Sequence, residues 1–434
     1  MILYLIQVYR KTVFKQSIGG DLVRSLITLG IGQMEIDWGK NLTINNHAAL
    51  FQRCDLKEIP CYYVNDDTDE PITKMKEGFS RKLRLVKPRL DLLGYDLTSI
   101  HIQFDELIRE CEDHGGEVPL TFDLYYEALK TLDLSSASTI RYEVEGYENG
   151  YALGEYVVNC VLRIPEINRK LIGSPPDDRN HIIYDLAIFL ENLDPYITLR
   201  ILAENPENLD LDLQWNYSDA LEGGWISQED VFDDLNPTHR ILIVTEGSSD
   251  SFVLKKTLKE LYPEIADFFD FIDMKDNYPF TGTGSLYNFC VGLCRINVLN
   301  NIMVIFDNDT AGVEKYKQAA SLKKPKSFLI TKLPDHPDFC NMQTVGPQGN
   351  TTENINGTAV AIECFLDFNC VPNPPIVRWT EYRKNEKAYQ GELEKKEIYV
   401  SKFKNASLID SSYNISKLRY LVDFLIQQWI NRNH

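Results

Sequence analysis

The second half of the chain alternates short apolar runs with segments of helical periodicity. Four nearly continuous apolar runs begin near residues 240, 268, 300 and 326. Between them, apolar residues recur at three-and-four spacing, which predicts amphipathic helices. Continuous runs are typical of strands buried on both faces, and strands that alternate with helices favour a parallel sheet of βαβ units. We therefore expect an α/β module over residues 237–370, followed by an extension over 371–434 that closes with an apolar helix.

The first half of the chain has a different pattern of apolar residues. Residues 1–90 mix short apolar alternations with turn residues, whereas residues 91–203 show helical periodicity. Residues 204–236 hold ten carboxylates and no Lys or Arg, which is typical of a solvated connection between domains. The expected fold class is an α/β module with a parallel sheet, joined to a mixed α+β, helix-rich N-terminal module over residues 1–236.

The net charge of the chain limits the functions that it can have. The 434 residues carry a formal net charge of −19 at pH 7, so the molecule as a whole repels nucleic acid and any contact with phosphates must be local. Residues 371–434 are net positive, with 11 basic and 7 acidic side chains, and we expect this tail to help bind a polyanion. The nine Cys form no Cys-x-x-Cys pair, and no apolar run approaches the roughly 18 residues of a membrane span. We expect a cytoplasmic protein with no membrane partner.

Two of the expected strands end in carboxylates. Glu246, Gly247 and Asp250 follow the first strand, and Asp307 and Asp309 follow the third. Because the carboxyl ends of parallel strands share one edge of a sheet, these carboxylates should converge, and Gly247 should permit a sharp exit from its strand. Oxygen ligands of this kind suit Mg²⁺ or Mn²⁺. The alternative is that the carboxylates only cap the helices that follow, but the two motifs together favour a metal site.

With these motifs, residues 240 to about 332 resemble a Toprim domain, the metal-binding fold shared by topoisomerases, bacterial primases and OLD-type nucleases. Glu246 and Gly247 match the glutamate motif of that family, and Asp307 and Asp309 match its Asp-x-Asp motif. The glycine-bearing loop of the family is similar to residues 282–285. Three further segments, 89–97, 345–366 and 389–396, resemble bacterial proteins of the HEPN/Toprim-associated family. The resemblance implies a Toprim, Rossmann-like parallel sheet for the C-terminal module.

Among Toprim proteins, a nuclease is the best match, because the chain lacks the Cys and His spacing of a primase zinc ribbon and a recognisable strand-cleaving domain of a topoisomerase. The resemblance implies hydrolysis of phosphodiester bonds with two Mg²⁺ or Mn²⁺ ions. The expected ligands are Glu246, Asp307 and Asp309 for the first ion, with Asp250 and Glu363 for the second. Lys396 would neutralise charge in the transition state. The expected substrate-binding residues are Gly247, Gly282, Gly284, Ser285, Arg378 and Lys395.

The expected partner is nucleic acid, either DNA or RNA, with tRNA among the candidates. Proteins similar to this one are associated with bacterial defence against phage, which implies an effector with a partner protein from a defence system; a homo-oligomer is left open. One alternative is a catalytically silent Toprim module that binds nucleotide or nucleic acid and signals through the N-terminal half. A second alternative is a HEPN-type RNase, for which Arg109 and His114 have the required spacing. Because about one such pair is expected by chance in a chain of this composition, we interpret the pair as a surface feature.

Overall fold

The chain forms two compact units that do not follow the order of the sequence. The computed structural model describes residues 26–32, 34–39, 45–64, 71–116, 118–135, 160–224, 226–232, 239–272, 282–296, 298, 300–410 and 412–433. Within these residues, unit 1 comprises parts of Met1–His47, Arg53–Leu83 and Gln103–Val231. Unit 2 comprises Ala48–Gln52, Arg84–Ile102 and Phe232–His434. Two short segments of the N-terminal half therefore fold with the C-terminal half.

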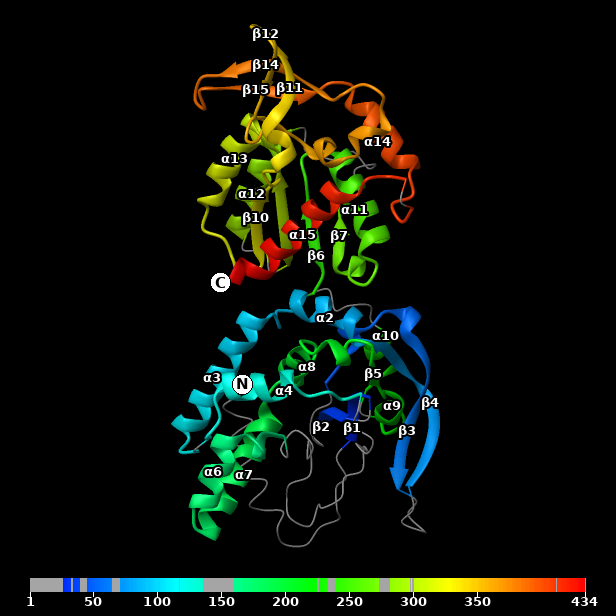
Figure 1. Ribbon diagram of the computed structural model, residues 1–434, viewed down its shortest axis with the longest axis vertical. Coiled ribbons are helices and arrows are strands. Elements are labelled where there is room, and N and C mark those ends of the chain that lie inside the picture. The colour runs from blue at the N-terminus through cyan, green and yellow to red at the C-terminus, as the bar shows by residue number, and fades with distance from the viewer. Residues whose placement is uncertain are drawn as a thin grey trace. The chain divides into compact units, whose positions relative to one another are not determined.

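Unit 1 is built on a five-stranded antiparallel sheet with the strand order β2-β1-β5-β4-β3 (Figure 1). Its strands are β1 (Leu26–Ile31), β2 (Met34–Gly39), β3 (Leu56–Val64), β4 (Pro71–Lys82) and β5 (Asp212–Trp215). Its helices are most of α3 (Leu97–Asp113), α4 (Phe122–Lys130), α6 (Pro165–Gly173), α7 (Pro176–Asn192), α8 (Pro195–Leu202), α9 (Ser218–Glu222) and α10 (Gln228–Phe232). The helix-rich, mixed character expected of the N-terminal part is confirmed.

The acidic connection expected over residues 204–236 is wrong for the part of it that the structure describes. β5 lies in the middle of the sheet between β1 and β4. Leu213 and Trp215 are buried, and the Trp215 ring stacks on Phe79 at 5.6 Å between centroids. The alternate positions are Asp212 and Gln214, and Asp212 pairs with Lys82 at 3.0 Å. An alternating strand can thus place one face in the core even within a strongly acidic segment.

Unit 2 contains a four-stranded parallel sheet with the order β10-β8-β6-β7 (Figure 1). Its strands are β6 (Ile241–Val244), β7 (Phe269–Phe271), β8 (Asn301–Phe306) and β10 (Phe328–Lys332), and the helices between them are α11 (Ser248–Leu261), α12 (Thr283–Ile296) and α13 (Thr310–Ala320). All neighbouring strands run parallel. The α/β character and the parallel sheet expected from the sequence are therefore confirmed.

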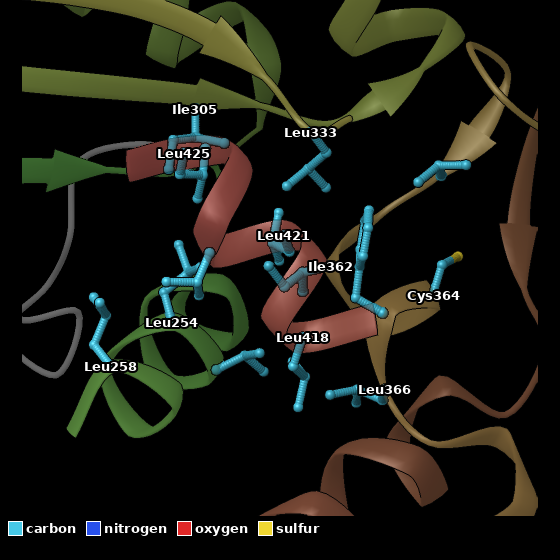
Figure 2. Packing of buried hydrophobic residues seen from close by; sticks show 14 of the residues in the cluster. Leu254, Leu258, Ile305, Leu333, Ile362, Cys364, Leu366, Leu418, Leu421 and Leu425 are labelled. Atoms are coloured by element: carbon cyan, nitrogen blue, oxygen red, sulfur yellow. The ribbon is translucent and has the colours of Figure 1, made fainter. Parts of the chain in front are cut away.

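Alternate residues of the sheet face two separate cores. On β8, Met303 and Ile305 belong to a cluster with residues of α11 and of α15 (Ser416–Ile430), whereas Val304 and Phe306 pack against residues of α12 and α13. Figure 2 shows Ile305 of the sheet with Leu421 and Leu425 of α15 in the first of these cores. Because helices cover both faces, the central strands have no polar face and read as continuous apolar runs.

The C-terminal residues form part of unit 2 rather than an appended tail. A second four-stranded sheet has the order β12-β11-β14-β15, in which β11 and β14 are parallel and the other pairs are antiparallel. The elements after β10 are β11 (Met342–Gly346), β12 (Gly349–Glu353), β13 (Ala359–Val360), the short 3-10 helix η7 (Ile362–Phe365), β14 (Ile376–Arg383), β15 (Ala388–Leu393) and α14 (Lys396–Asn405). The sequence pattern predicted only a charged stretch at β14 and β15, because few of their side chains are buried.

A buried arginine holds the N-terminal segments in unit 2. Arg89 lies on α2 (Leu83–Leu92) and is fully buried. Its guanidinium donates to the carbonyl oxygen of Ala49 at 2.8 Å and to the carboxylate of Asp267 at 2.7 Å, and it lies 4.6 Å from the centroid of the Phe268 ring. A buried charge of this kind needs such a complete set of partners.

Candidate functional site

The order in which strands are added to the parallel sheet of unit 2 reverses at β6. β7 lies on one side of β6 and β8 lies on the other, so consecutive strands are added to opposite sides. In sheets of this kind, ligands bind outside the carboxyl ends of the strands at this switch point. Glu246 follows the end of β6 by two residues, and Asp307 follows the end of β8 directly. Both carboxylates therefore lie at the edge where a ligand would be expected.

Asp309 is held by a tight turn at the start of α13. Its Oδ1 accepts a hydrogen bond from the backbone N–H of Gly312 at 2.6 Å, and its Oδ2 accepts one from Nε2 of Gln390 on β15. The same Gln390 accepts from the N–H of Ala311 at 2.9 Å. A Cβ on residue 312 would lie 2.2 Å from the carbonyl oxygen of Asp307. Only glycine permits this close approach of the helix to the Asp-x-Asp turn.

Asp250 and Glu363 reach the same environment from other elements. β9 (Asn308–Asp309) pairs with β13, and η7 with Glu363 follows β13 closely. Glu363 is 7% exposed and Asp250 is 8% exposed. Oδ2 of Asp250 accepts a hydrogen bond from the N–H of Gly247 at 3.0 Å, which caps α11. The pairing of β9 with β13 thus brings a carboxylate that is distant in the sequence to the Asp-x-Asp turn.

The carboxylates act strongly on one another. Burial raises the pKa of Asp307 well above its usual range, and the charges of Asp250, Glu246, Asp309 and Glu363 raise it further. Burial and then the charge of Asp309 raise the pKa of Glu246 to about 7. Burial and then the charge of Glu363 raise the pKa of Asp250 to about 7. A carboxylate that only capped a helix would have a lowered pKa, so capping alone does not account for this group.

One oxygen of the group has no hydrogen-bond partner. Oε2 of Glu246 accepts from the hydroxyl of Thr283 at 3.0 Å, whereas Oε1 is buried and unpartnered. A buried oxygen without a donor is costly unless a cation or water satisfies it. The donor set consists of carboxylate oxygens, which suits Mg²⁺ or Mn²⁺. Among the described residues, no three His, Cys, Asp or Glu side chains are arranged to hold an ion as they stand, so ion binding would require these side chains to turn toward it.

Among the described residues, no hydrogen bond or ion pair joins the basic residues named from the sequence to this group. Lys395 and Lys396 are exposed at the start of α14. Arg378 is 55% exposed along its side chain and pairs with Glu394 at 2.5 Å. Burial raises the pKa of Asp309, and the basic side chain whose charge opposes this rise is instead Arg383, at the end of β14.

Arg383 also has an unsatisfied donor. Its Nε is buried and has no hydrogen-bond partner. Its terminal nitrogens lie 3.7 Å from a carboxylate oxygen of Glu314 and 3.9 Å from one of Glu381, both beyond hydrogen-bond distance. The sequence carried no signal that separated Arg383 or Gln390 from their exposed neighbours, since only the folding of β14 and β15 beside α13 brings them to Asp309.

The glycines of the expected substrate site play different parts. Gly247 has φ of −135° and ψ of 161°, an extended backbone that any residue adopts, so the expected sharp exit is wrong. Gly282 has φ of +84° and does require glycine. Gly284 and Ser285 lie in the first turn of α12. Thr283, between them and Gly282, is the residue of this loop that contacts a carboxylate.

Comparison with known proteins gives one match. Residues 24–239 match the family model described as HEPN/Toprim N-terminal domain 1. The match supports the HEPN/Toprim-associated family. No curated protein and no solved structure matches the chain. A domain of this family indicates a nuclease-like or nucleic-acid-related function. None of the described helices is long and apolar enough to cross a membrane.

The Arg-x4-His pair lies inside the matched region, on and just after α3. Nε of Arg109 donates to the carbonyl oxygen of Asp105 at 3.2 Å, and Nδ1 of His114 contacts the carbonyl oxygen of Glu110 at 2.7 Å. Each side chain therefore bonds to the backbone one turn before it. Both groups are therefore engaged locally on the same helix end.

Proposed function

We propose that unit 2 hydrolyses phosphodiester bonds of nucleic acid with the help of divalent metal ions. The observation that carries the proposal is the unpartnered, buried Oε1 of Glu246 within a group of mutually repelling carboxylates. The position of this group at the switch point of a parallel sheet supports it. Two further points support the proposal: the resemblance of residues 240–332 to Toprim domains, and the family match of residues 24–239.

In this proposal, the residues of the chain prepare a site for two ions. The first ion would be bound by Glu246, Asp307 and Asp309, and the second by Asp250 and Glu363. The ions would polarise the phosphate and lower the pKa of an attacking water. The hydrogen bond from Thr283 fixes one oxygen of Glu246 and leaves the other for the ion, and Gln390 fixes the orientation of Asp309.

A cationic side chain is also needed to offset charge on the phosphate. The sequence favoured Lys396, but Arg383 is better placed, because it acts on Asp309 and has an unpartnered Nε. Arg383→Ala should therefore lower the cleavage rate more than Lys396→Ala. Equal effects of the two substitutions would contradict this assignment.

The broader role proposed is that of an effector in bacterial anti-phage defence, with the N-terminal half in regulation and a defence-system protein as partner. This role rests on the resemblance of the sequence to HEPN/Toprim-associated proteins. Expression of the chain with its neighbouring genes during phage infection, compared with an Asp307→Asn version, tests it. Equal phage yields from the two versions would contradict the role.

The test of the activity is direct. Purified protein is incubated with plasmid, single-stranded DNA and total cellular RNA, each with Mg²⁺, Mn²⁺ or EDTA. We expect metal-dependent cleavage of at least one substrate, and its loss in Asp307→Asn, which removes one charge at nearly constant volume. Asp410→Asn, on an exposed loop of unit 2, is the matched control and should cleave normally. Binding of nucleic acid without cleavage by the wild type would support the silent binding module instead.

A further inference from the structure

Two tyrosines lie next to each other on the exposed hairpin of β14 and β15. Tyr382 and Tyr389 are paired in the strand register, and their ring centroids are 5.0 Å apart in an edge-to-face arrangement. The two residues are 48% and 42% exposed. The ring of Trp379 lies 6.5 Å from that of Tyr389. Single exposed apolar residues are ordinary, but adjacent exposed aromatic rings are typical of a binding surface.

The surroundings of these rings carry both signs of charge, and Arg378 is paired with Glu394 at 2.5 Å, so the unpaired positive charge is concentrated toward the turn. Residues 378–387 contain two Arg and two Lys against two Glu. Lys384 and Lys387 are exposed in the turn of the hairpin. Of the two glutamates, Glu386 is paired with Lys317 of α13 at 2.9 Å. The turn of the hairpin therefore suits a polyanion on a protein that is otherwise strongly acidic.

The hairpin is continuous with the carboxylate group. Gln390, which holds Asp309, is the residue after Tyr389. The carbonyl oxygen of Tyr389 itself accepts a hydrogen bond from the hydroxyl of Thr310 at 2.8 Å. Figure 1 shows β15 next to α13, the helix that Asp309 caps. The backbone of Tyr389 therefore lies beside the helix that carries Asp309, whereas its ring, on the face of the strand opposite to the side chain of Gln390, is exposed.

We propose that the β14–β15 hairpin binds single-stranded nucleic acid by stacking unpaired bases on Tyr382 and Tyr389. This inference rests on the proposed function and names its substrate class. Aromatic side chains stack on bases that are splayed out of a helix, whereas the bases of a duplex are already stacked on one another. The lysines of the turn contribute attraction to the phosphates between those bases. The hairpin thus selects single strands, or single-stranded regions of a folded RNA, for the carboxylate site.

The experiment measures binding apart from cleavage. Full-length Asp307→Asn protein in Mg²⁺ is titrated into fluorescein-labelled 12-nucleotide DNA, RNA of the same sequence, and the corresponding DNA duplex, and anisotropy is recorded. Adding Tyr382→Ala and Tyr389→Ala should weaken single-strand binding by about 5- to 150-fold for each base that no longer stacks. Duplex binding should change little. Replacing both tyrosines with Phe should preserve single-strand binding, because the ring faces remain.

Two controls separate stacking from charge and from general loss of aromatic surface. Tyr420→Ala removes a tyrosine of α15 that is equally exposed at 42%, and it should bind like the parent. The double variant Lys384→Gln with Lys387→Gln should have a shallower slope of log affinity against log salt concentration. The expected reduction is about 0.7 for each phosphate that the protein no longer neutralises. The tyrosine variants should keep the slope of the parent protein. If the double alanine variant does not fold, Tyr382→Ala alone, which removes the more exposed ring, provides the comparison.

The outcomes distinguish this inference from the function on which it rests. Unchanged single-strand affinity in a folded tyrosine variant, or an equal loss of duplex affinity, overturns the inference even if the wild type cleaves nucleic acid. Tyrosine-dependent binding of single strands by a wild type that cleaves nothing upholds the inference and overturns the nuclease. A tyrosine-dependent preference for single strands together with cleavage upholds both.

Discussion

Replacing Asp250 with Asn should stabilise the metal-free protein at alkaline pH. The pKa of the buried Asp250 is raised from 3.8 to about 7, chiefly by burial and by the charge of Glu363. The folded state therefore holds this proton more tightly than the unfolded state, and the free energy of unfolding falls as pH rises from about 4 to 7. A shift of roughly three units corresponds to roughly 4 kcal/mol at pH 8. Asn carries no charge, and its oxygen can still accept the hydrogen bond from Gly247.

The assay is differential scanning calorimetry of the wild type and Asp250→Asn in EDTA at pH 4.5, 5.5, 7 and 8. We expect the variant to melt several degrees higher at pH 8, at roughly 2–4 °C per kcal/mol for a unit of this size, and the difference to shrink toward zero at pH 4.5. Asp410→Asn removes the same charge from an exposed site and should follow the wild type at every pH. Added Mg²⁺ should raise the melting temperature of the wild type more than that of Asp250→Asn.

The reasoning is refuted if Asp250→Asn melts at or below the wild-type temperature at pH 8 and the two proteins show the same dependence on pH. In that case the buried carboxylates do not repel one another in solution. Because the protein has a net charge of −19, acidification alone changes the stability of both proteins, so only the difference between them is informative.

Three further predictions concern individual side chains. Gly312→Ala should lower the free energy of unfolding by about 1–3 kcal/mol, because its Cβ would clash with the carbonyl oxygen of Asp307; urea unfolding measures this, and unchanged stability would show that the turn can relax. Asp307→Ala should abolish cleavage without lowering the melting temperature in EDTA. If this variant still cleaves at the wild-type rate, Asp307 is not part of the site. Arg109→Ala with His114→Ala should leave nucleic-acid cleavage intact, and loss of RNA cleavage in that folded variant would move the active site to unit 1.

The elements of the parallel sheet could be predicted because both faces of each strand are buried. The run at 302–306 is apolar throughout, and its residues divide between two cores. β14 and β15 could not be predicted in the same way, since only three of their fourteen residues are buried. β5 was mistaken for a linker because the acidic residues of the surrounding segment concealed the alternation of Leu213 and Trp215.

For the candidate site, the sequence determined which carboxylates follow which strands. That information is local, because parallel strands place their carboxyl ends at one edge whatever the rest of the fold, and it was enough to name Glu246, Asp307 and Asp309. The tertiary structure decided what surrounds them. The pairing of β9 with β13 brought Glu363 to the group, and the position of the β14–β15 hairpin brought Gln390 and Arg383. Contacts between such distant residues depend on the packing of whole elements, which no local pattern of side chains encodes.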